Sequence, residues 1–164
     1  MAQAEGAAGK ADRAVTTVDI WGLVDVYVRG IPAPQGSKRH VGRGILVESS
    51  KKVKPWRDAV RSTVAEAWPD GMLDEAVVVD MWFFFPRPAG HYGTGRNAGL
   101  LKASAPAFPA GPPDVDKLAR STMDGITAAG LWRDDARVVE LVGRKRYCDF
   151  DQHPGARIIV RRAV

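Results

Sequence analysis

Apolar residues follow two different periods along the first half of the chain. In residues 21–30, Val24, Val26 and Val28 alternate with more polar positions, as in a half-buried strand. In residues 55–68, apolar side chains recur at intervals of three and four residues, which is the spacing of one helix face. The pattern therefore predicts a strand followed by an amphipathic helix.

The second half predicts one more helix and three more strands. Residues 75–85 are the most apolar run and predict a central strand, with the four aromatic residues 82–85 in the core. Residues 114–129 are helical in composition, and Gly130 is suited to end that helix. Two strands are expected at 136–148 and 156–162. This order of elements predicts an α+β fold with a small mixed sheet of about four strands and two helices packed on it.

The segments between these elements define the domain organisation. The Ala/Gly-rich residues 1–18 predict a disordered extension, and 19–164 a single domain. Residues 86–113 are rich in Gly and Pro, contain basic residues but no acid, and predict a long flexible loop. A loop of that length inside a small domain is usually either functional or disordered.

Composition narrows the possible functions only moderately. The chain has 45% apolar residues, as expected for a globular core, and a formal net charge of +5, which favours a polyanionic partner. Cys148 is the single cysteine, so neither an intrachain disulfide nor a cysteine metal site is expected. No secretory or membrane segment is visible, which predicts a cytoplasmic protein without membrane contact.

Candidate chemistry is concentrated in residues 112–140. Asp114 and Asp116 follow two prolines that favour extended backbone, where residues i and i+2 point to the same side. Arg120 and Asp124 follow Asp116 at one-turn intervals on a helix face, and Asp135 opens the next strand. Clustered carboxylates are ligands for Mg²⁺ or Mn²⁺. An Asp-x-Asp pair alone is equally typical of surface turns, and Asp116 is also a candidate helix cap.

The whole string is more specific than its parts. The segments PDVDKLARSTMDGI and GLWRDDARVVE resemble the signature of the RusA family of Holliday-junction resolvases, P-D-x-D-N-L-x-K-x-x-x-D-A-L followed by G-x-x-x-D-D-x-Q-V. With its flanking elements the resemblance covers about residues 23–162. Arg120 stands where the family has a catalytic lysine, Lys117 where Asn is common and Gly125 where Ala is common.

The resemblance implies a RusA-like homodimer that makes paired nicks in four-way junction DNA, in a bacterial cell or a phage-infected host. It implies that Asp114, Asp116 and Asp135 bind Mg²⁺, with Mn²⁺ as a possible substitute, and that Arg120 contributes to catalysis. Basic residues of the loops and of the signature block are the candidate DNA contacts: Lys38, Arg39, Arg96, Lys102, Lys117, Arg144 and Lys145.

Two other functions remain open at this point. The first is a junction-DNA-binding protein of the same fold that cuts weakly or not at all, because arginine keeps the charge of lysine but cannot exchange a proton near neutral pH. The second is an unrelated Asp-x-Asp enzyme such as a nucleotide-sugar transferase or a phosphatase. The chain shows no glycine-rich phosphate loop that would favour the latter.

Overall fold

The fold is described from a computed structural model, which covers residues 23–36, 38–40, 46–48 and 51–164. The predicted extension at residues 1–18 lies outside the described residues. The elements are β1 (Val24–Arg29), β2 (Lys38–His40), β3 (Leu46–Glu48), α1 (Val53–Ala67), β4 (Val77–Phe85), α2 (Val115–Ala129), β5 (Val138–Tyr147) and β6 (Gly155–Arg162). Short 3₁₀ turns lie at 89–91, 95–97 and 135–137.

Four strands form one mixed sheet in the order β1-β6-β4-β5, and β2 pairs with β3 in a separate hairpin. β4 and β5 run parallel, while β6 is antiparallel to both β1 and β4. A parallel pair needs a long crossover, and here residues 86–137 supply it, including α2. The predicted α+β class, with a four-stranded mixed sheet and two helices, is confirmed. The β2–β3 hairpin was not predicted.

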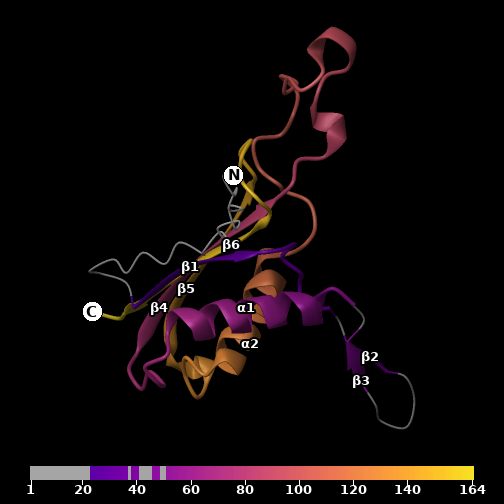
Figure 1. The fold of residues 1–164 in the computed structure, drawn as a ribbon. Coiled ribbons are helices and arrows are strands. Elements are labelled where there is room, and N and C mark those ends of the chain that lie inside the picture. The colour runs from indigo at the N-terminus through magenta and orange to yellow at the C-terminus, as the bar shows by residue number, and fades with distance from the viewer. Residues whose placement is uncertain (1–22, 37, 41–45, 49–50) are drawn as a thin grey trace, which may run out of the picture.

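Both helices lie on the same side of the sheet (Figure 1). The core is the layer between the helices and the sheet. The strands present their buried residues to this side by simple alternation, as at Val77, Val79, Met81 and Phe83 of β4. This alternation corrects the expectation that all four aromatic residues 82–85 belong to the core. Phe83 is fully buried and Phe85 packs against the core at its edge, whereas Trp82 and Phe84 alternate onto the opposite side and are only half-buried.

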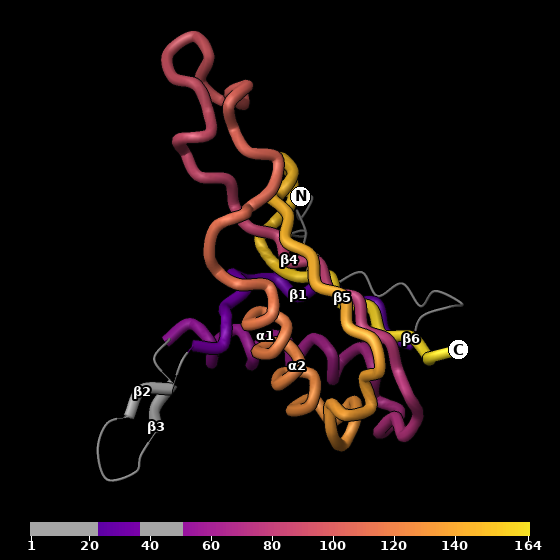
Figure 2. Tube along the Cα trace, turned by 180° about the vertical axis from the view of Figure 1, so that it is seen from behind, coloured from indigo at the N-terminus to yellow at the C-terminus, as the bar shows by residue number. Residues whose placement is uncertain are grey.

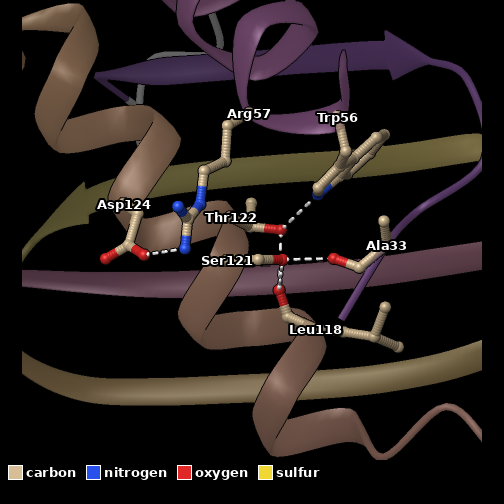
Figure 3. Close-up of polar contacts among 7 residues, drawn as sticks. All are labelled: Ala33, Trp56, Arg57, Leu118, Ser121, Thr122 and Asp124. Carbon is tan, nitrogen blue, oxygen red and sulfur yellow. Dashed lines mark hydrogen bonds and ion pairs between the residues drawn. The ribbon is translucent and has the colours of Figure 1, made fainter. Parts of the chain in front are cut away.

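Polar contacts hold the two helices together inside this layer (Figure 3). The indole of Trp56 donates a hydrogen bond of 3.0 Å to the hydroxyl of Thr122, and Arg57 pairs with Asp124 at 2.5 Å. Asp124, expected on the face of Arg120, therefore contributes to the helix contact. Gly125 allows close packing, because a Cβ there would lie 2.8 Å from the Cβ of Val60. These contacts fix the position of α2 against α1.

The side of the sheet turned away from the helices carries paired charges and half-buried aromatic rings. Asp80 is buried between Arg144, at 2.9 Å, and Arg161, and Arg144 also lies over the ring of Trp82. Burial by itself raises the pKa of Asp80, but hydrogen bonds from the two arginines lower it by more, so the pKa lies below its ordinary value. We call this side of β1, β4, β5 and β6 the open face.

Residues 86–113 form an arm that projects beyond the end of the sheet in both views (Figures 1 and 2). The arm folds back on itself as an irregular hairpin, with hydrogen bonds from the Gly93 amide to the Leu100 carbonyl and from the Lys102 amide to the His91 carbonyl, both 2.9 Å. It therefore has internal backbone pairing, which the composition did not predict. Its flexibility stays a prediction.

None of the helices in the described part of the chain combines the length and apolar character needed to cross a bilayer.

Candidate active site

The carboxylates of the signature block lie around the start of α2. Asp114 is the N-cap residue, with extended backbone (φ −69°, ψ 138°), and its carbonyl accepts the first helical hydrogen bond, from Leu118 at 3.1 Å. Asp116 already belongs to the first helical turn. This corrects two expectations: the extended segment ends at Asp114, so the two carboxylates are not an i, i+2 pair on a strand, and Asp114 occupies the cap position expected for Asp116. Negative charge at both positions is favoured by the helix dipole.

One open cavity of about 1000 Å³ gathers Asp116, Arg120 and Asp135. Met123, Val138 and Leu141 add apolar wall to this space, which we call the carboxylate cavity. Asp135 reaches it because the chain turns at Gly130 and β5 then runs back along α2. The close approach of Gly143 in β5 to Val115 at the start of α2 shows this reversal (Figure 2). Gly130 has the left-handed backbone (φ 81°) that lets the helix end there.

The three charged groups of the carboxylate cavity are exposed. Within the described part of the chain, no side-chain hydrogen bond or ion pair engages Asp116, Arg120 or Asp135. Other acidic side chains nearby are paired, as Asp124 is with Arg57. The cavity therefore offers two carboxylates and a guanidinium to an outside ligand.

Asp114 lies in the neighbouring cavity and is paired. Its carboxylate contacts the Lys117 ammonium at 2.7 Å. The hydrogen bond from Lys117, with a smaller contribution from Lys145, lowers the pKa of Asp114 below its ordinary value, and the same pair raises the pKa of Lys117. Lys117 also lines the carboxylate cavity, where Asp116 attracts it in addition to Asp114.

The donor set fits a hard divalent cation, although no complete ligand cluster is formed. Among the described residues, no three His, Cys, Asp or Glu side chains lie close enough together to hold a metal ion. Mg²⁺ usually keeps several waters and needs only one or two carboxylates beside substrate phosphate, which Asp116 and Asp135 can supply. For Asp114 to join them, Lys117 must first release it.

Besides Lys117, which pairs with Asp114, the two expected DNA-contacting residues on β5 make contacts within the protein. The Lys145 ammonium donates hydrogen bonds to the carbonyls of Gly111, at 2.7 Å, and Pro113, at 2.9 Å, so it ties β5 to the base of the arm. Arg144 lies on the open face, away from the carboxylate cavity, in its pair with Asp80. Their predicted DNA contacts stay predictions.

The remaining expected contacts lie on the two projections. Arg96 is exposed in a 3₁₀ turn of the arm, and the Lys102 ammonium donates to the Gly90 carbonyl at 2.8 Å. Lys38 and Arg39 lie on β2, where the described part of the structure is the backbone. The arm thus presents at least Arg96 as a cation directed to solvent.

Gln35 is a residue of this region that the sequence did not single out. Its backbone amide donates a hydrogen bond of 3.0 Å to the backbone carbonyl of Lys117. This bond holds the segment after β1 against the first turn of α2. Its side chain lines both cavities, and its Oε1 atom is buried with no hydrogen-bond partner among the described residues. A search for charged residues passes over an amide in a Pro/Gly-rich loop.

The fold and the cavity define a small basic α+β protein with carboxylates and an arginine gathered at one open site. A family model described as endodeoxyribonuclease RusA matches residues 29–161, and therefore nearly the whole chain. The chain belongs to the RusA endodeoxyribonuclease family. No curated protein matches it.

Proposed function

We propose that the protein is a Mg²⁺-dependent, structure-selective endodeoxyribonuclease that resolves Holliday junctions by paired phosphodiester hydrolysis. Membership of the RusA family implies a nuclease that acts on Holliday junctions. The observation that carries the finer proposal is the presence of Asp116, Arg120 and Asp135 in one open cavity within the matched residues, with no hydrogen bond or ion pair to their side chains from the described part of the chain. The carboxylates suit a cation, and the guanidinium beside them suits a phosphate.

The proposed roles follow from the positions of these side chains. Asp116 and Asp135 would hold the metal ion, and Asp114 would join them when Lys117 moves to a DNA phosphate. A bound divalent ion supplies charge neutralisation at the phosphate and lowers the pKa of a bound water. Arg120 adds a fixed positive charge one helical turn from Asp116, where it orients the scissile phosphate and transfers no proton.

A second copy of the chain is part of the proposal, because two cuts at one junction need two sites. The open face supports dimerisation, since Trp82 and Phe84 are half-buried in the single chain and no further element of the described chain covers them. The charge pairs around Asp80 would then lie inside an interface. We expect this dimer to work in the cytoplasm of a bacterium or of a phage-infected host.

One observation favours a weaker activity. Lys117 forms an ion pair with Asp114 and keeps this carboxylate from a metal ion, so the ligand set is incomplete. If Lys117 keeps Asp114, the protein would bind junction DNA and cut it slowly or not at all. This is the alternative candidate function.

Cleavage of a synthetic four-way junction, with Mg²⁺ and with EDTA, separates the two candidates. We expect cutting by the wild type with Mg²⁺ only. Asp116→Asn should abolish cutting and keep binding, because the neutral amide is a poorer ligand for the cation but the DNA-facing charges remain. Arg120→Lys should stay active, since the charge is kept.

Asp70→Asn is the matched control, because Asp70 is exposed between α1 and β4 and lines neither cavity. It should cut like the wild type. Cutting by Asp116→Asn at the wild-type rate would remove the assigned site. Junction binding without cutting by the wild type would select the alternative.

A further inference from the structure

The cavity beside the carboxylate cavity has different chemistry. It has a volume of about 610 Å³, within the range of small-molecule sites, and its wall is mainly apolar. The wall comes from the segment after β1 and from the base of the arm: Ile31, Pro32, Ala33, Pro34, Phe85 and Pro113. We call it the apolar cavity. It shares the lining residues Gln35, Gly36 and Lys117 with the carboxylate cavity, so the two cavities adjoin.

Cations and one amide stand at the edges of this apolar wall. Lys52 and Lys117 both line the cavity, and among its described lining residues the acid is Asp114, which pairs with Lys117 in the free protein and would turn to the metal ion when Lys117 moves to a phosphate. Gln35 lines the cavity, and its side-chain oxygen is buried without a donor among the described residues. A buried acceptor without a partner is unfavourable, so a turn of the Gln35 side chain toward a ligand N–H in the cavity would give this oxygen a hydrogen bond that it lacks among the described residues.

These features match one part of a nucleotide. A nucleobase has flat apolar faces and an edge of hydrogen-bond donors and acceptors, and it is attached to a negative backbone. A base in the apolar cavity would lie against the proline and phenylalanine wall, its edge would face the Gln35 amide, and its phosphates would lie near Lys52 and Lys117. Glutamine amides are established readers of base edges.

We propose that the apolar cavity is a nucleobase subsite, which takes one unstacked DNA base next to the phosphodiester bound in the carboxylate cavity. The inference rests on the proposed nuclease function and deepens it, because it assigns a place where the base beside the cut is recognised. Unstacking is least costly where base pairing is already interrupted, as at a branch point. Gln35 is the specificity residue of this subsite, and Ile31 forms its outer wall.

The test is binding of four-way junctions that lack one base. Single abasic residues are placed in turn at each position flanking the scissile phosphate, and the dissociation constant is measured by fluorescence anisotropy with the non-cutting Asp116→Asn protein. We expect one flanking position to bind about fivefold or more weakly without its base, and the other positions to be unaffected. 2-Aminopurine at that position should brighten on binding, because the base leaves the stack.

Filling the cavity should remove this effect. Ile31→Trp, in the Asp116→Asn background, places a larger ring at a position that is 51% exposed and therefore tolerant of size. It should erase the abasic penalty, while Met72→Trp, at a position that is 60% exposed and lines neither cavity, should keep it. Gln35→Ala should reduce the penalty, and Gln152→Ala, in the turn between β5 and β6, should not.

Three results would overturn the subsite. They are the absence of any position-specific abasic penalty, a penalty of the same size in Ile31→Trp and Met72→Trp, and a change in dimerisation by Ile31→Trp in place of a change in base dependence. The last result would assign the cavity to a second copy of the chain. Failure of wild-type cleavage, by contrast, tests the proposed catalysis, because the abasic measurement needs binding only.

Discussion

Gly125→Ala is the sharpest test of how the helix layer positions the site. The added Cβ would lie 2.8 Å from the Cβ of Val60, 2.9 Å from its Cγ1 and 3.1 Å from the carbonyl oxygen of Arg57. Carbon atoms in contact prefer separations of about 3.5–4.0 Å. No rotamer change moves a Cβ atom, so α1 and α2 must move apart.

The expected cost follows from two opposing effects. Overpacking of a core costs about 1–3 kcal/mol, and replacing Gly by Ala inside a helix returns about 1 kcal/mol. Because the clash involves the Val60 Cβ and backbone, the upper end of the first range applies, which leaves a net loss of about 2 kcal/mol. For a chain of this size that lowers the melting temperature by about 4–8 °C.

Thermal unfolding followed by circular dichroism measures this loss, and junction cleavage measures its effect on the site. Cleavage should fall, because α2 carries Asp116 and Arg120. Gly90→Ala, where an added Cβ meets nothing within 4 Å, is the control and should melt like the wild type. In the double variant Gly125→Ala/Val60→Gly the two losses should be less than additive by about 1 kcal/mol. A higher melting temperature for Gly125→Ala, or strict additivity, would refute the reasoning.

Three further changes test the charges. The pKa of Asp80 is depressed in the folded protein, so its contribution to stability is present above the unfolded pKa of about 3.9 and is lost as the pH falls below it. Asp80→Asn should therefore flatten the acid limb of stability, measured by urea unfolding at several pH values; an unchanged limb would contradict the depressed pKa. Arg96→Ala should reduce the slope of log affinity for junction DNA against log salt by about 0.9, and an unchanged slope would exclude a phosphate contact from the arm. Lys117→Asn should free Asp114 and strengthen Mn²⁺ binding severalfold by calorimetry, whereas equal affinity would argue against Asp114 as a ligand.

The sequence predicted the elements whose pattern is set by burial on one side. The first helix was expected at 55–68 and spans Val53–Ala67, because its buried residues recur at helical spacing. The hairpin β2–β3 was missed because three-residue strands are too short to show alternation. The sequence did not show which residues of β4 face the helices, because nearly every position of the run is apolar and the alternation between buried and half-buried residues is hidden.

The candidate site was predictable as far as it depends on one stretch of chain. Asp116, Arg120 and Asp135 share a cavity because α2, Gly130 and β5 follow one another in sequence and fold back together. The pairing of Asp114 with Lys117 depends on where the helix begins, to within one residue. Gln35 reaches the site because its loop, some eighty residues before α2 in the sequence, packs against the first turn of that helix. No local sequence pattern encodes such a contact.

The two hydrogen bonds from Lys145 anchor the base of the arm to the sheet. They join the last residues of the arm, Gly111 and Pro113, to β5, a strand of the rigid sheet, directly before Asp114 begins α2. The backbone that enters the first turn of that helix is therefore held at a defined place on the sheet.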